Sequence, residues 1–184
     1  MAEKLKLRRI WLGLGTNQGD RLANLQQAVS FLQAHSAIQL LSCSQVYETE
    51  YVGPGTQDDY LNASVEIQSG SDLLVLLDDF QKLEKSLGRM ADGHMKPRPL
   101  DLDFLLVDDL VMSDERLEIP HPRLHERLFV LEPLNDIAAR KKIPNSGETV
   151  GSLCAKIRRK DGAAVMLRPD LVLEPGPSGA NMEE

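Results

Sequence analysis

Cysteine is nearly absent from this chain of 184 residues, and the two that occur, Cys43 and Cys154, lie far apart. No CxxC or Cys/His spacing accompanies them, which excludes the common zinc sites and predicts two free, buried thiols. No apolar run approaches the ~18 residues that a membrane span needs, and the first residues lack an apolar signal core. These absences favour a cytoplasmic protein without a membrane partner.

The chain also lacks an excess of positive charge. Lys and Arg number 21 against 28 Asp and Glu, which gives a formal net charge of −7. Nucleic-acid binders are usually basic, so we expect no nucleic-acid partner, only small molecules. With 42% hydrophobic residues, the length suits one globular domain, residues 1–173, acting as a monomer, with a disordered tail at 174–184.

The two common phosphate-binding glycine loops are missing as well. GxxxxGK[ST] occurs nowhere, and G-L-G-T-N-Q-G at residues 13–19 has the spacing GxGxxxG rather than GxGxxG. We interpret these glycines as a strand-to-helix turn that needs their backbone freedom.

Hydrophobic patterning predicts strands and helices in the order β-α-β-β-α-β. Helices are expected after Asp20 and after Ser71 or Asp72, and later at 129–139 and 150–158. Strands are expected at residues 8–14, 38–47, 60–68, 100–107 and 163–167, with a hairpin turn at 108–109 leading into 110–112. This order predicts an α+β fold with a ferredoxin-like core, in which helices cover a mainly antiparallel sheet.

Asp101 and Asp103 interrupt an otherwise apolar strand. Residues i and i+2 of a strand share a face about 6.5–7 Å apart, so the two carboxylates converge, while the even-numbered residues 100–106 face the core. Such a pair repels unless a cation intervenes, and oxygen ligands without His or Cys suit Mg²⁺. We expect metal ions and phosphates, rather than protein side chains, to compensate these charges, and one Asp to have a raised pKa without metal. Two solvated aspartates on a sheet face are the alternative.

Three further features could contact substrates. Arg98 lies between two prolines that hold it extended, and its guanidinium can grip a phosphate. Cations recur from Arg116 to Arg127, where prolines flank His121; a solvated charged surface is the alternative. Tyr60 and Asn62 share one face of a strand expected to be half-buried, and a ring beside a carboxamide suits a flat heterocycle.

Together, four ordered segments resemble the 6-hydroxymethyl-7,8-dihydropterin pyrophosphokinase family of folate biosynthesis, over about residues 10–139. They are the Gly-Thr-Asn turn at 15–17, D-Y-L-N-A at 59–63, R-P-L-D-L-D-F-L-L at 98–106 and I-P-H-P-R at 119–123. The resemblance implies an ATP-dependent transferase that moves pyrophosphate to the hydroxymethyl group of the pterin and releases AMP. It also implies two Mg²⁺ ions as cofactors, with ATP as co-substrate.

The resemblance further implies roles for individual residues. Asp101 and Asp103 would hold the metal ions, and Arg89 and Arg98 would neutralise the transferring group. Nucleotide or phosphate contacts would come from Gln81, Glu84, Arg98, Arg116, His121 and Arg127. The pterin pocket would comprise Thr49, Val52, Tyr60, Asn62 and Phe129, with Tyr60 and Phe129 as its stacking rings.

Two other readings of the residues stay open at this point. A different metal-dependent nucleotidyl or glycosyl transferase would also use a DxD pair, but would not need a flat-ring pocket. A non-enzymatic ligand-binding module would leave the aspartates solvated and would bind no ATP analogue in a Mg²⁺-dependent way.

Overall fold

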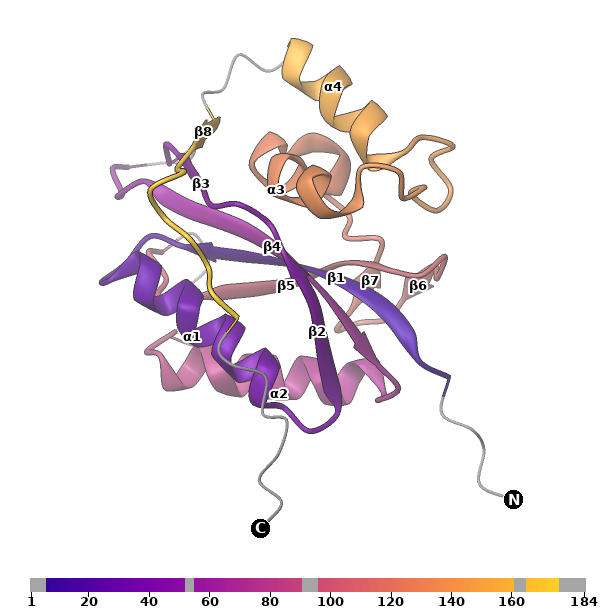
Figure 1. The fold of residues 1–184 in the computed structure, drawn as a ribbon, viewed down its shortest axis with the longest axis horizontal. Helices are drawn as coiled ribbons and strands as arrows, with labels where there is room; N and C mark the ends of the chain where they lie inside the picture. Colours follow the sequence, from indigo (N-terminus) through magenta and orange to yellow (C-terminus); the bar gives the residue numbers. More distant parts are fainter. Residues whose placement is uncertain (1–5, 52–54, 91–95, 161–164, 176–184) are drawn as a thin grey trace.

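One antiparallel sheet with helices on both faces forms the framework of the protein (Figure 1). The computed structural model describes residues 6–51, 55–90, 96–160 and 165–175. The strands run β5–β1–β4–β3–β8, and β2 also pairs with β4. Their bounds are β1 Arg8–Thr16, β2 Ile38–Cys43, β3 Tyr47–Thr49, β4 Tyr60–Ser69, β5 Asp101–Val107 and β8 Val165–Leu167. The expected ferredoxin-like α+β architecture is confirmed.

Within the described residues, four α-helices cover the sheet. In Figure 1, α1 and α2 lie on one side of it, and α3 and α4 on the other. The bounds are α1 Arg21–Ala34, α2 Leu73–Ser86, α3 Leu128–Ala138 and α4 Val150–Lys160. A two-stranded sheet of β6 (Met112–Ser113) and β7 (Glu118–Ile119) and a 3₁₀ turn, η1 (Leu124–Glu126), precede α3. None of the described helices is long and apolar enough to cross a membrane.

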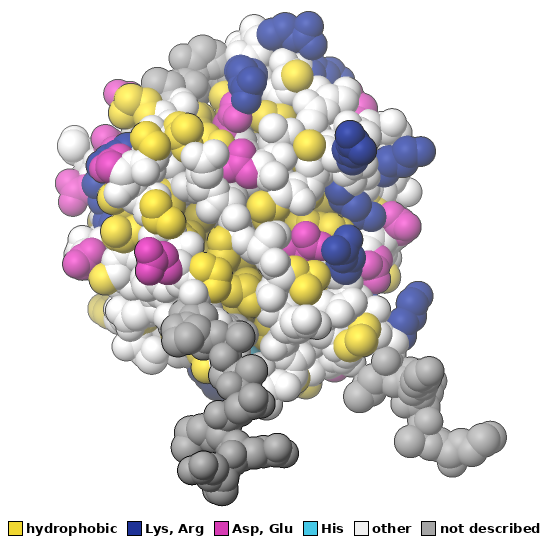
Figure 2. All heavy atoms as spheres, in the orientation of Figure 1, with side chains coloured by type: hydrophobic (Ala, Val, Ile, Leu, Met, Phe, Trp, Pro, Cys, Tyr) yellow, Lys and Arg dark blue, Asp and Glu magenta, His cyan; other side chains and the backbone are white. Residues whose placement is uncertain are grey.

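The helix boundaries follow local capping chemistry. Asp20 accepts a hydrogen bond from the Ala23 amide (3.0 Å), and Asp72 accepts one from the Leu74 amide (2.8 Å), so both predicted N-caps are confirmed. Gly88, with φ +102°, follows the end of α2 as predicted. The last turn of α4 carries Arg158, Arg159 and Lys160, and Lys and Arg side chains gather over this part of the molecule in Figure 2. Cations at this end complement the helix dipole.

Two hydrophobic clusters hold the layers together. Leu12, Leu14 and Phe104 belong to the cluster that includes the buried residues of α1 and α2. Trp11 and Leu105 belong to the second cluster, which includes those of α3 and α4. The sheet is therefore buried on both faces over much of its length.

This double burial corrects the expectation that residues 60–68 form a half-buried strand. Asn62, Ser64 and Glu66 are buried like their apolar neighbours, with exposures of 5%, 0% and 7%. The physical reason is α3, which packs against β4 on the face that the polar residues occupy. Alternation of polar and apolar residues did not reveal that a later helix covers this face.

Strand β5 departs from the expected alternation. Trp11 pairs with Leu106 and Leu12 with Phe104, so Leu105 is an extra residue in a β-bulge. The predicted faces hold as far as Phe104, but Leu106 turns to the second cluster. The expected hairpin after this strand is wrong too, because Met112 pairs with Ile119 of β7 and not with β5.

Candidate active site

The candidate site lies where β1 and β3 end and where β4 and β5 begin. Gly15 of β1 pairs with Asn62 of β4 on one side and with Asp101 of β5 on the other. Paired residues of neighbouring strands share a face, so the carboxylate and the carboxamide flank a position without a side chain. A Cβ at Gly15 would meet Asn62 Oδ1 at 3.6 Å and Asp101 Cβ at 3.9 Å.

Gly13 repeats this arrangement two residues earlier. It pairs with Ser64 and with Asp103, but a Cβ there would lie 3.3 Å from the Leu105 side chain, so Leu105 packs over this glycine and the open position is at Gly15. Both glycines lie inside β1, which corrects their interpretation as turn glycines: here glycine provides space. Gly19, with φ +69°, is the glycine that needs its backbone freedom in the turn before α1.

Protein side chains neutralise Asp101. Arg98 Nη1 lies 2.6 Å from Asp101 Oδ2, and Arg89 Nη1 lies 2.8 Å from Oδ1. The expectation that only metal ions and phosphates compensate the carboxylates is therefore wrong for Asp101. Three predicted site residues therefore form one cluster: Asp101, Arg89 and Arg98.

Among the described residues, no Lys or Arg forms an ion pair with Asp103 like those at Asp101. Burial of Asp103 first, and then the charges of Asp101 and Glu84, raise its pKa to about 7, while Arg127 and Arg89 oppose the shift. The expectation that one aspartate has a raised pKa without metal is confirmed. Such a carboxylate gains from a bound cation.

Glu84 links α2 to the beginning of β5. Its Oε1 accepts a hydrogen bond from the Leu102 amide (2.8 Å), and its Oε2 lies 2.5 Å from Arg89 Nη1. Burial raises the pKa of this carboxyl, and Arg89 opposes the shift. The side chain is 5% exposed, so its contacts position Arg89 and β5. Gln81, predicted to contact the nucleotide, lies half-buried one helical turn earlier.

Three residues that were predicted to line the pterin pocket lie together on β3 and β4: Thr49, Tyr60 and Asn62. Asn62 donates a buried hydrogen bond to Thr49 Oγ1 (2.9 Å). The ring of Tyr60 stacks on that of Tyr51, with centroids 6.4 Å apart. Sequence reasoning missed Tyr51, whose only signal was an aromatic residue beside a Gly/Pro-rich loop. Val52 lies outside the described residues.

The cationic segment divides into two parts. Burial, together with the charge of Arg127, lowers the pKa of His121 to about 4, so this imidazole is neutral at pH 7. The Arg127 guanidinium lies 5.6 Å from the centroid of the Phe129 ring. Burial and the charge of Arg123 lower the pKa of Arg127, while the charges of Asp103 and Asp101 oppose the shift, so this part of the segment interacts electrostatically with the carboxylates. Arg116 instead contacts Asp78 on α2.

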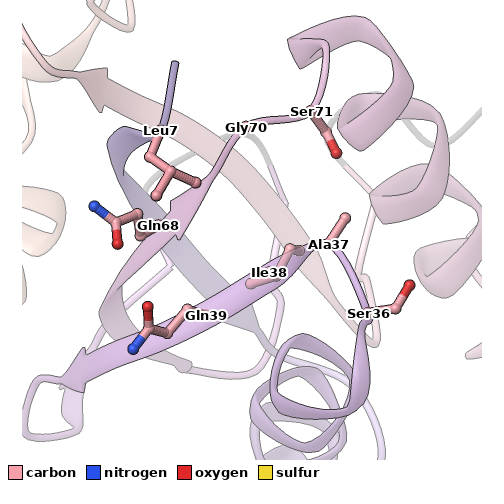
Figure 3. A pocket seen from close by; sticks show the side chains of 8 residues that line it. All are labelled: Leu7, Ser36, Ala37, Ile38, Gln39, Gln68, Gly70 and Ser71. Atoms are coloured by element: carbon pink, nitrogen blue, oxygen red, sulfur yellow. The ribbon is translucent and has the colours of Figure 1, made fainter. Parts of the chain in front are cut away.

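A shallow groove at the opposite end of the sheet does not belong to this site (Figure 3). It is lined by Leu7, Gln39, Gln68 and their neighbours, around the beginning of β1 and β2 and the end of β4. These lining residues include no charged or titratable side chain. This groove therefore offers no side chain for acid–base chemistry.

Comparisons with known proteins identify the family of this chain. The 7,8-dihydro-6-hydroxymethylpterin-pyrophosphokinase (HPPK) family profile matches residues 11–139. The 2-amino-4-hydroxy-6-hydroxymethyldihydropteridine pyrophosphokinase of Bacillus subtilis is 41% identical over 140 residues, which cover 76% of this chain and 84% of that protein. The Methylorubrum extorquens protein of the same name is 40% identical over 149 residues, 81% and 93% of the two chains.

Solved structures share the fold. The crystal structure of Plasmodium falciparum HPPK-DHPS A437G with STZ-DHP aligns with a TM-score of 0.67 at 14% identity, covering 88% of this chain and 48% of that longer chain. Fold and matches together define a class: an ATP-dependent pyrophosphoryl transferase. Within that class, the chain belongs to the HPPK family, whose members act in folate biosynthesis.

Proposed function

We propose that the site around Gly15 transfers pyrophosphate from ATP to the hydroxymethyl group of 6-hydroxymethyl-7,8-dihydropterin, with Asp101 and Asp103 holding two Mg²⁺ ions. The observation that carries the assignment is the row Asn62–Gly15–Asp101 across three paired strands. A carboxamide suited to a heterocycle edge and a carboxylate suited to a cation are neighbours on one open face. The acceptor hydroxyl and the phosphates of ATP can therefore meet there.

The donor set fits Mg²⁺. Within the described residues, no group of three or more His, Cys, Asp or Glu side chains could hold a metal ion. A site of two aspartates suits Mg²⁺, which keeps waters and binds substrate phosphates as its other ligands. The raised pKa of Asp103 is the expected behaviour of a carboxylate whose cation is supplied from outside the protein. When bound, Mg²⁺ supplies positive charge to the phosphate oxygens.

Two arginines already lie at the proposed metal site. Arg89 and Arg98 both contact Asp101, and a guanidinium is suited to bind a phosphate. In the proposed reaction the hydroxymethyl oxygen bonds to the β-phosphorus as the bond from that phosphorus to the AMP oxygen breaks, and the hydroxyl proton passes to the solvent. The two arginines then stabilise the charge of the transferring group, while Thr49, Tyr60 and Asn62 orient the pterin.

The test is release of AMP from ATP, measured with and without the hydroxymethyl pterin. We expect pterin-dependent release, and a loss of about 10²-fold or more in Asp101→Ala and Asp103→Ala with the fold retained. The matched control is Asp109→Ala, just beyond the other end of β5, where the side chain is 88% exposed. Near-normal transfer by Asp101→Ala or Asp103→Ala at saturating Mg²⁺ would show that the metal assignment is wrong.

The proposal also includes a cytoplasmic monomer that binds no nucleic acid. Its support is the net charge of −7 and a reaction that needs only two small substrates. Light scattering of the purified protein, with and without ATP, tests the monomer; a stable dimer would contradict it.

A further inference from the structure

We infer that Asn17 is a positioning residue that couples the pterin side of the site, at Tyr60, to its phosphate side, at Arg98. This inference rests on the proposed function, because it uses that assignment of the two sides. Asn17 directly follows β1 and is 1% exposed. A buried carboxamide requires hydrogen-bond partners, and the partners of this one come from two separate segments that enter the site.

On one side, Asn17 is bound to the segment before β4. Its Nδ2 donates to Gln57 Oε1 (3.0 Å) and to the Asp58 carbonyl (3.2 Å). Two residues further on, β4 begins with Tyr60, whose ring stacks on Tyr51. The carboxamide therefore fixes the backbone that leads into the pterin residues.

On the other side, Asn17 is bound to Arg98. Its Oδ1 accepts a hydrogen bond from the Arg98 amide (2.9 Å), and its own amide donates to the Arg98 carbonyl (3.1 Å). Both backbone groups of Arg98 are thus held by one residue, while the Arg98 guanidinium contacts Asp101 at 2.6 Å. The backbone position of the phosphate-side arginine depends on Asn17.

Backbone polarity fixes the orientation of this carboxamide. The Arg98 amide can only donate and the Asp58 carbonyl can only accept, so exchanging Oδ1 and Nδ2 would lose both bonds. Neither Ala nor Asp can replace the side chain: Ala makes no bond, and Asp would set an oxygen against the Asp58 carbonyl. Only a side chain with a donor and an acceptor in this geometry joins the two segments.

A shift of either segment should therefore displace the other. If bound ATP moves Arg98 off Asp101, the change passes through Asn17 to residues 57–60, and pterin binding acts on Arg98 in return. Thermodynamic linkage requires the effect to be equal in both directions. We therefore expect Asn17 to make the binding of the two substrates cooperative without contacting either of them.

The test compares the Kd of hydroxymethyl pterin alone with its Kd in the presence of Mg²⁺ and a non-hydrolysable ATP analogue. The ratio of the two is the coupling factor, which we expect to be about 5-fold or more in the unaltered chain. Asn17→Ala and Asn17→Asp should bring it close to one, while each Kd for a single ligand changes much less. The matched control is Asn24→Ala, which loses a bond to Gln18 in the same turn (2.9 Å) but reaches neither segment.

Gln57→Ala is the second variant, in case Asn17 variants do not fold. It removes one of the two bonds to the pterin-side segment, and should at least halve the coupling factor with an unchanged melting temperature. A wild-type factor of one, or unaltered coupling in Asn17→Asp or in Gln57→Ala, would overturn the inference. So would equal losses in both single-ligand affinities, which indicate a structural role only. Absence of pterin binding or AMP release by the wild type would instead contradict the proposed function.

Discussion

At the scale of single residues, Gly15 leads to a prediction that separates binding from stability. A Cβ there would have ordinary contact distances to its neighbours, from 3.6 Å upward, and its φ is not in the left-handed region. Gly15→Ala should therefore fold, with a free energy of unfolding unchanged or raised by about 0.4–1 kcal/mol.

The same methyl group would occupy the open face between Asn62 and Asp101. We expect pterin binding to weaken about 10-fold, or ~1.4 kcal/mol, and Gly15→Val to weaken it further. Calorimetric titration with pterin, beside urea unfolding of the same samples, checks both statements. Unchanged pterin affinity in Gly15→Val would show that this face is not part of the pocket.

The sequence predicted a site role for the two aspartates of this face but not for its two glycines. Asp101 and Asp103 could be predicted because charge inside an apolar strand conflicts with burial. The role of Gly13 and Gly15 could not, because a glycine that provides space resembles one in a turn until its paired strands are known. Asn17 belonged to a recognised motif, but its partners lie about 40 and 81 residues away, beyond any local pattern.

At the scale of elements, the carboxyl-terminal segment leads to a prediction about stability. Strand β8 pairs with β3, and Leu173 is buried in the main cluster with 5% exposure. Glu174, which the sequence assigned to the tail, exchanges two hydrogen bonds with Gln26 of α1. This segment lies beyond the family match at residues 11–139, yet it completes the sheet edge that carries Thr49.

We expect Leu173→Ala to lower the free energy of unfolding by about 2–5 kcal/mol. Val172→Ala is the control, because that neighbouring side chain is 63% exposed and its loss should cost less than about 0.5 kcal/mol. Urea unfolding of the two variants makes the comparison. Equal effects would mean that the segment does not pack as described.

Elements set by local chemistry were predictable, and those set by distant partners were not. Asp20 and Asp72 cap their helices where the sequence placed them, since a cap needs only its own first turn. The bulge at Leu105 depends on the pairing of β5 with β1, a strand far away in the sequence. For the same reason the burial of Ser64 became evident only once α3 was placed over β4.

At the scale of the whole molecule, stability should depend on pH through two site residues with opposite signs. The pKa of Asp103 is raised from 3.8 to about 7, so the folded chain binds more protons between these values. Its contribution to the free energy of unfolding is therefore lost as pH rises from about 4 to 7. The pKa of His121 is lowered from 6.5 to about 4; its contribution is present above 6.5 and is lost as pH falls.

Asp103→Asn removes the first effect and His121→Gln the second, so urea unfolding of both variants from pH 4 to 8 without metal separates them. We expect Asp103→Asn to be more stable than the wild type at pH 8, because it no longer places a buried charge beside Asp101. Mg²⁺ with an ATP analogue should recover stability at pH 8 in the wild type, since it binds the deprotonated carboxylate, and much less in Asp103→Asn. Parallel pH curves for wild type and Asp103→Asn would show that the pKa of this carboxyl is not raised, and that its burial is offset by charges within the protein.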